Sequence, residues 1–189
     1  MRNLAFDFSG GKSDFMVLDV ETQRLADEVV GGWANVEGFG VAVVVTWDPT
    51  HEMRVWFESD VERLLQEATR FNPIVTFNGE NFDFRVLSAL GNVDYLKRHS
   101  SDLLVEVSRK TGFRVKLDSL AKATLGRGKS GAGIDSVQWW RDGQKQKVID
   151  YCKMDVELTR DLYRFAKENG YVVIDDLKTG QTRRVELAL

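Results

Sequence analysis

The sequence has little of what marks fibrous, disordered, secreted or membrane proteins. Its 189 residues include two prolines and one cysteine, with 43% hydrophobic and 29% charged residues. This composition excludes collagen-like, disordered and low-complexity proteins. No apolar run approaches the roughly 20 residues that a membrane helix needs. We therefore expect no membrane association, and a single domain that buries one sizeable core.

The cysteine and the first residues bear on the cellular compartment. Cys152 has no second cysteine with which to form a disulfide inside the chain, which favours a reducing environment. Residues 1–12 alternate charged, aromatic and glycine residues, without a basic segment followed by an apolar stretch, so we expect no secretory signal. Both features predict a cytoplasmic protein.

Charge is distributed unevenly along the chain. The net charge is −3, which by itself does not indicate a nucleic-acid-binding protein. From Arg109 to Lys147, however, ten lysines and arginines stand against three acids, which gives this cationic segment a net charge of +7, against −10 elsewhere. The cationic segment could bind a polyanion, and it could equally be an ordinary solvated surface.

Hydrophobic patterning predicts strands first and mostly helices later. Strands are expected at Phe15–Glu21, Gly38–Asp48, His51–Glu58 and Pro73–Phe77, with a short fifth strand before Asp102 and a closing hairpin of Tyr171–Asp176 and Arg183–Leu187. Helices are expected from Ser59 or Asp60, at Phe82–Leu90, Asp102–Lys110, Leu117–Leu125 and Ser136–Arg141, and from about residue 144 to residue 169 before Gly170. This order predicts an α/β fold with a mixed central sheet and helices on both faces.

Two acids stand near the end of the first expected strand. Asp19 and Glu21 are two residues apart, so both side chains face the same side of the sheet. Adjacent carboxylates at the end of an apolar strand are costly unless a cation or a solvent opening relieves their repulsion. The pair is therefore a candidate metal site.

Further acids lie on two expected helices. Asp83 opens the helix after Asn78-Gly79, where an acid also simply favours the helix dipole. Tyr151 and Asp155 are four residues apart on the long helix and share one face, a spacing that is also typical of surface pairs. Each of these motifs is weak by itself.

Together the three motifs resemble a known family. Asp19-x-Glu21, Asn78-Gly-x-x-Phe82-Asp83 and Tyr151-x-x-x-Asp155, in this order, resemble the exonuclease motifs of the DEDD superfamily, and the tyrosine indicates its DEDDy branch, which includes polymerase proofreading domains. The resemblance implies a ribonuclease H-like three-layer fold for a single domain over 1–189, with the motifs in a core of about 15–169 and a hairpin at 171–189. It also implies a metal-dependent 3′–5′ exonuclease that releases nucleoside monophosphates from single-stranded 3′ ends.

The resemblance assigns roles to the motif residues. Asp19, Glu21, Asp83 and Asp155 would hold two divalent cations, Mg²⁺ or Mn²⁺, which prefer hard oxygen ligands; no Cys/His cluster points to zinc. Asp19 would bridge both ions, Glu21 and Asp155 would complete the site of the nucleophile-activating ion, and Asp83 would serve the second. Tyr151 would orient the attacking water, since a phenol with an ordinary pKa of about 10 is a poor general base.

Other residues are candidates for substrate contacts. Asn78 and Phe82 lie where the family contacts the terminal nucleotide, although core packing explains Phe82 equally well. Trp33 and Trp139-Trp140 could stack on bases, but core anchoring is the favoured interpretation for these tryptophans.

A glycine-dense stretch, Gly126–Gly133, follows the helix expected at Leu117–Leu125. Ala123–Ser130 matches a loosened ATP phosphate-loop pattern, but a genuine phosphate loop follows a strand, so ATP binding is not expected. Lys129 in this stretch is expected to contact the phosphate backbone of the substrate.

The expected partner is single-stranded nucleic acid, DNA in preference to RNA. Because we recognise no polymerase or helicase domain in the 189 residues, we expect a free-standing nuclease or a subunit recruited to a polymerase, a helicase or another repair or replication protein. Two alternatives fit the same residues. One is a non-catalytic nucleic-acid-binding or scaffolding module on this fold, and the other is an exonuclease specific for RNA, since ribose discrimination depends on pocket contacts.

Overall fold

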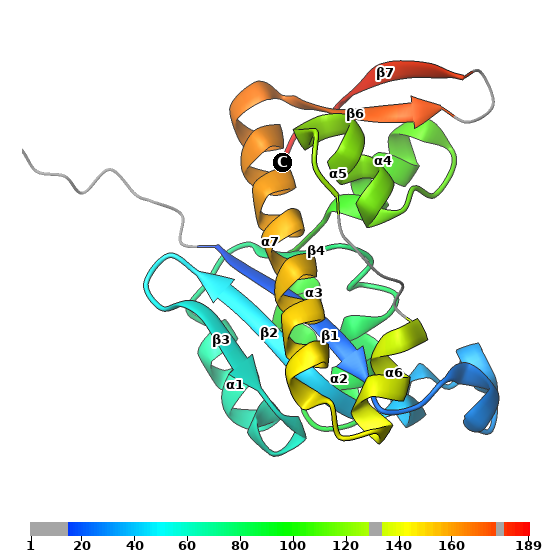
Figure 1. Cartoon of the computed structure of the whole chain (residues 1–189). Coiled ribbons are helices and arrows are strands. Elements are labelled where there is room, and N and C mark those ends of the chain that lie inside the picture. Colours follow the sequence, from blue (N-terminus) through cyan, green and yellow to red (C-terminus); the bar gives the residue numbers. More distant parts are fainter. Residues whose placement is uncertain (1–14, 129–133, 177–179) are drawn as a thin grey trace, which may run out of the picture.

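Five strands form a mixed sheet at the centre of the molecule in a computed structural model that describes residues 15–128, 134–176 and 180–189 (Figure 1). The strand order is β3-β2-β1-β4-β5. The strands are β1 (Met16–Thr22), β2 (Val41–Asp48), β3 (Glu52–Trp56), β4 (Ile74–Thr76) and β5 (Ser100–Asp102). Strands β1, β2 and β3 pair antiparallel, whereas β1, β4 and β5 pair parallel. The predicted mixed sheet with a short fifth strand is confirmed, and β1 lies in its middle.

Helices cover both faces of this sheet, as expected for the α/β fold. One layer consists of α1 (Val61–Ala68), α2 (Asp83–Ser88) and α3 (Asp94–Arg98). The other consists of α4 (Leu103–Thr111), α5 (Leu117–Leu125), α6 (Ile134–Arg141) and α7 (Lys145–Asn169). Strands β6 (Tyr171–Asp176) and β7 (Gln181–Glu186) form the predicted closing hairpin. Short 3₁₀ helices, η1 (Ala26–Glu28), η2 (Gly32–Ala34), η3 (Val36–Phe39) and η4 (Glu58–Asp60), and helix α3 were not predicted.

Strand β1 separates two hydrophobic cores. Met16, Leu18 and Val20 pack with the α1–α3 layer, whereas Val17 packs with the layer of α4, α5 and α7. Because side chains alternate between the faces of a strand, Asp19 and Glu21 share the face of Val17 and lie on the α7 side. Strand β1 thus directs the side chains of Asp19 and Glu21 toward α7.

Helix α7 connects the sheet to the closing hairpin. It contacts β1 and β2 along the sheet and β6 at its far end, as the ribbon in Figure 1 shows. Gly170, with φ of 77°, follows the helix, and its N–H donates to the Ala166 carbonyl, as expected of a C-terminal cap. In the described ranges, α7 included, no helix is long and apolar enough to cross a membrane.

Candidate active site

Three carboxylates from β1 and α7 form an acidic cluster. Asp19, Glu21 and Asp155 each offer a ligand oxygen, and these oxygens lie within 4.8 Å of one another. Glu21 and Asp155 are buried and Asp19 is partly buried. Gathering negative charge away from water is unfavourable, and a bound cation would offset that cost. The structure thus brings together three of the four acids that the sequence singled out.

Asp83, the fourth acid, begins α2 and is 4% exposed. Its Oδ1 has no hydrogen-bond partner among the residues that the structure describes. Burial is the main reason that the pKa of Asp83 is raised to about 8; hydrogen bonds involving its own backbone and that of Val20 oppose the rise, and the charges of Asp102 and Glu21 add to it. Asp83 is not part of the 4.8 Å group, although the charge of Glu21, a member of that group, adds to the rise in the pKa of Asp83.

Helix α6 adds a contact that the sequence did not predict. The buried Ser136 hydroxyl donates a hydrogen bond of 2.5 Å to Glu21 Oε2. The sequence placed Ser136 only at the start of a helix, and no local pattern marks a serine that binds a carboxylate 115 residues away. This hydrogen bond orients the Glu21 side chain, as partners of metal-binding carboxylates commonly do.

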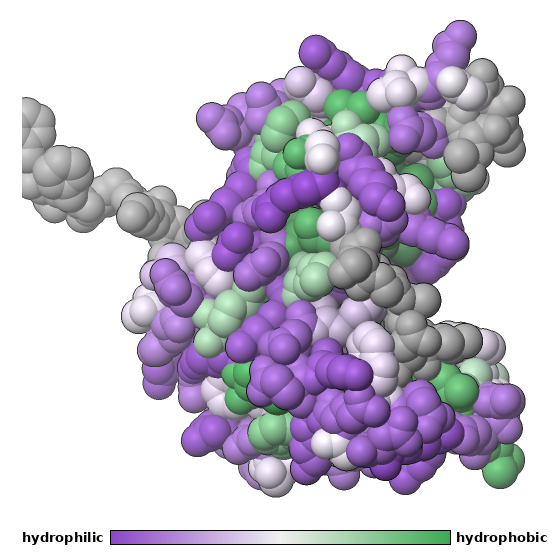
Figure 2. All heavy atoms as spheres, viewed as in Figure 1, coloured by the Kyte–Doolittle hydropathy of each residue, from purple (hydrophilic) through white to green (hydrophobic). Residues whose placement is uncertain are grey.

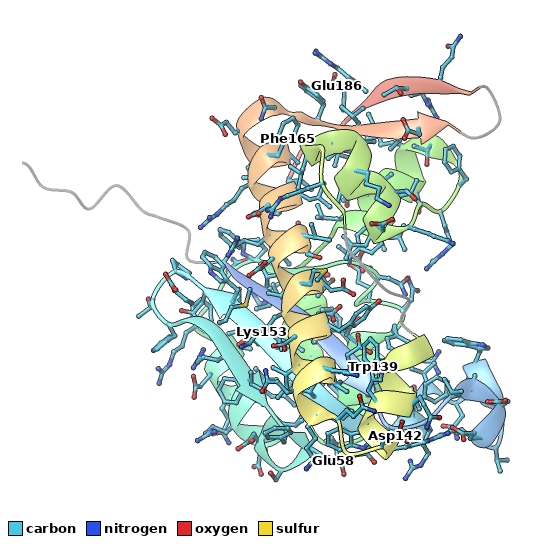
Figure 3. All side chains as sticks on the ribbon, viewed as in Figure 1. Glu58, Trp139, Asp142, Lys153, Phe165 and Glu186 are labelled. Carbon is cyan, nitrogen blue, oxygen red and sulfur yellow. The ribbon has the colours of Figure 1, made fainter. Side chains whose placement is uncertain are left out.

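Tyr151 is buried on α7, one helical turn before Asp155. Its ring meets that of Trp139 edge to face, with centroids 6.0 Å apart. Trp139 belongs to α6 and is labelled in Figure 3. The neighbouring Cys152 Sγ lies 3.3 Å from Asp19 Oδ2. Burial first, and the charge of Asp19 second, raise the pKa of the Cys152 thiol well above its usual range, so the thiol donates to that carboxylate. Cys152 is a second site contact that sequence reasoning missed.

Asp102 fixes the turn between β4 and α2. Its carboxylate accepts hydrogen bonds from the backbone N–H groups of Asn78 (2.8 Å) and Glu80 (3.0 Å). The same carboxylate caps α4 by accepting from Leu104 (2.9 Å) and Val105 (3.2 Å). Asn78 has a φ of 75°, which asparagine tolerates better than most residues. One buried acid therefore holds the turn against the start of α4.

Both expected nucleotide contacts belong to the stretch from this turn to α2. The Asn78 side-chain oxygen accepts a hydrogen bond of 2.8 Å from Arg114 Nη2, so an arginine of the cationic segment reaches the turn. Phe82 is half-buried, and its ring lies 6.1 Å from that of the core residue Phe39. Phe82 therefore packs on the core and still has exposed surface.

The three tryptophans considered as stacking platforms have different environments. Trp139 and Trp140 are partly buried against the core on the α7 side, which confirms core anchoring for these two. Trp33 is 70% exposed, so core anchoring is wrong for Trp33. Its segment lacks a regular hydrophobic period that could have distinguished a buried from an exposed position.

The glycine-dense stretch is described only in part. Helix α5 ends at Leu125, and Gly126 follows with φ of 70°. The phosphate-loop-like Ala123–Ser130 therefore begins inside a helix and not after a strand, in line with a chance match. Lys129, the expected phosphate contact, lies outside the described residues.

Comparisons with known proteins agree with this fold. Curated proteins gave no match to the sequence. Among solved structures, the family B DNA polymerase from the hyperthermophilic archaeon Pyrobaculum calidifontis superimposes with a TM-score of 0.61 at 15% sequence identity. The match covers 83% of this chain and 25% of the polymerase chain, so the chain spans about a quarter of that protein. The family model of the RNase H superfamily matches residues 16–167, which include all four acids and Tyr151; the chain belongs to this superfamily of nucleases.

Proposed function

We propose that this protein is a metal-dependent 3′–5′ exonuclease of the DEDDy type. It would hydrolyse phosphodiester bonds at single-stranded 3′ ends and release nucleoside monophosphates. The observation that carries the proposal is the convergence of Asp19, Glu21 and Asp155 within 4.8 Å, with Tyr151 one helical turn from Asp155. A family fold alone would not require these side chains to meet.

The side chains fit divalent cations such as Mg²⁺ or Mn²⁺. All four acids carry hard carboxylate oxygens, and the buried Asp83 Oδ1 has no hydrogen-bond partner among the described residues. Asp19, Glu21 and Asp155 would hold one ion, and Asp83 would contribute to a second, with Asp19 shared. When bound, such ions would supply a hydroxide nucleophile at neutral pH and stabilise charge on the leaving oxygen.

The remaining side chains would position water and substrate. Tyr151, held against the Trp139 ring, would orient the attacking water through its hydroxyl. Asn78, on the turn fixed by Asp102, would contact the terminal nucleotide, and Phe82 would offer a partly exposed ring to its sugar or base. Each of these groups comes from an element anchored by buried contacts, which suits a site that must align reacting atoms.

The test uses 5′-labelled single-stranded DNA and RNA, incubated with Mg²⁺ or Mn²⁺ and resolved as product ladders. We expect ladders that shorten from the 3′ end, faster on DNA, and no shortening with a chelator. The matched control is Asp19→Ala, which should abolish turnover and leave the fold intact or slightly more stable, because one of several crowded acids is removed.

Retention by Asp19→Ala of more than about a tenth of wild-type activity would contradict the metal assignment. Ladders on RNA alone would redirect the proposal to an RNA exonuclease. A non-catalytic module would bind the strand without shortening it, and its melting temperature would not respond to Mn²⁺.

A further inference from the structure

The segment between β1 and β2, residues 23–40, exposes large apolar side chains. Val30 is 93% exposed and Trp33 is 70% exposed, the highest fractions among large apolar side chains in the described part of the chain. Figure 2 shows apolar side chains at the lower right, where Figure 1 places this segment. Single exposed apolar residues are common on protein surfaces, so exposure alone assigns no role.

Trp33 differs from Val30 because its ring lies beside that of Phe82, an expected nucleotide contact. The centroid of Trp33 lies 5.5 Å from that of the buried Phe39 and 6.2 Å from that of Phe82. Phe82 immediately precedes Asp83, the buried acid of α2. The indole thus contacts two neighbouring rings, those of Phe39 and Phe82, while most of its surface faces solvent.

Polar contacts tie the backbone around Trp33 to two helices. Arg85 of α2 donates to Glu37 from Nε (3.0 Å) and Nη2 (2.9 Å), and also to the Ala34 carbonyl (2.9 Å). Arg141 of α6 forms an ion pair with Glu28. The same two helices carry Asp83 and Ser136 of the candidate site. A ring held in this way loses little further freedom when a ligand stacks on it.

We propose that Trp33, together with Phe82, is a stacking platform for an unpaired base near the 3′ end of the substrate strand. This inference rests on the proposed function and adds to it a residue, Trp33, that would contact the bases of the single strand. Every base has a π-face, so stacking favours no sequence. A base-paired end offers fewer free faces, so the platform would select single strands.

The test is a binding cycle on the full chain. Fluorescence anisotropy with Ca²⁺ in place of Mg²⁺ measures the Kd of single-stranded DNA with normal bases, or with one abasic position among the last three. We expect Trp33→Ala to raise Kd for the normal strand by roughly 5- to 100-fold, the range of one base–aromatic stack. One of the three abasic positions should be the one whose base would stack on Trp33. For that strand, the Kd values of wild type and Trp33→Ala should differ much less.

Two further variants serve as controls. Trp33→Phe keeps an aromatic face and should retain most of the affinity. Val30→Ala removes an exposed apolar side chain from the same segment and should bind like wild type. Melting temperatures confirm that each variant folds. Equal Kd values for wild type and Trp33→Ala on the normal strand would overturn the platform. So would a ratio of the two Kd values that is the same for the normal strand and for every abasic strand.

The outcomes separate this inference from the exonuclease proposal. Normal ladders with unchanged KM in Trp33→Ala would refute only the platform. If the Kd depends on Trp33 and on the presence of a base, but the labelled strand is never shortened, only the exonuclease proposal is refuted. A wild-type protein that binds no single strand would refute both.

Discussion

The Ser136 hydroxyl donates a hydrogen bond to the Glu21 carboxylate and links α6 to the strand that carries two proposed metal ligands. Strand β1 and helix α7 alone would account for the positions of the three clustered acids. The serine adds a third element, because a carboxylate with a fixed partner has fewer orientations and is better prepared for a cation. Helix α6, which also supplies Trp139, is therefore part of the site and not merely a connection.

Removal of this hydroxyl is the first test. We expect Ser136→Ala to weaken Mn²⁺ binding or activity by about 10- to 100-fold, the usual range for partners of metal ligands. This loss is measured in two ways: as the Mn²⁺ concentration for half-maximal activity, and as the rise in melting temperature that Mn²⁺ produces. Ser136→Thr should recover part of the loss, and the exposed Ser119→Ala is the control. Identical Mn²⁺ dependence in Ser136→Ala and wild type would show that the bond does not serve the metal site.

Tyr151→Phe tests the proposed positioning of water. The variant keeps the ring and its contact with Trp139 but lacks the hydroxyl. We expect kcat to fall by roughly 10- to 100-fold, the size of a general acid–base contribution or smaller, with Mn²⁺ binding preserved. Steady-state kinetics and Mn²⁺ thermal shifts measure the two quantities. Wild-type kcat in Tyr151→Phe would mean that the tyrosine is structural and that the DEDDy assignment is wrong.

Asp83 should make the stability of the metal-free protein depend on pH. Its pKa is raised from 3.8 to about 8 by burial in the folded state, so between these values the folded protein binds the additional proton. The stability that this group provides at low pH is therefore lost as pH rises toward and through about 8. Asp83→Asn cannot ionise, so its melting temperature should fall less with pH and should exceed that of wild type at the alkaline end.

The melting temperatures of wild type and Asp83→Asn are compared in the presence of a chelator, from about pH 5 to about pH 8. Added Mn²⁺ should reverse the order, because it favours the ionised carboxylate of wild type and has no such partner in Asp83→Asn. If both proteins lose stability in parallel as pH rises, Asp83 is not the group that titrates.

The sequence predicted those parts of the molecule that local patterns determine. Strand β1 was recognisable because a buried central strand is continuously apolar, and Tyr151 and Asp155 because a helix places residues four apart on one face. The Ser136–Glu21 hydrogen bond could not be predicted, because its partners meet only once α6 packs beside β1. The same holds for Asp102, whose place before a helix was visible but whose bond to Asn78 depends on the pairing of β4 with β5.

Arg114 provides the last prediction, on the function of the cationic segment. It is exposed and donates to the Asn78 side chain at 2.8 Å, whereas Arg109, also exposed, donates to Glu106 on its own helix at 2.9 Å. Arg114→Ala should therefore raise KM with little change in kcat, and the rise in KM should be smaller at high salt, because salt screens the attraction to the phosphates. The slope of log affinity against log salt should fall by about 0.7, as for one lost phosphate contact on a single strand.

Arg109→Ala is the matched control, because it removes the same charge at a position that does not reach the turn. Lys129→Ala, at a residue outside the described ranges, is measured in the same series and is expected to raise KM in the same way. If Arg114→Ala and Arg109→Ala change KM and the salt slope equally, the effect is one of overall charge. The substrate path would then have to be placed away from Asn78.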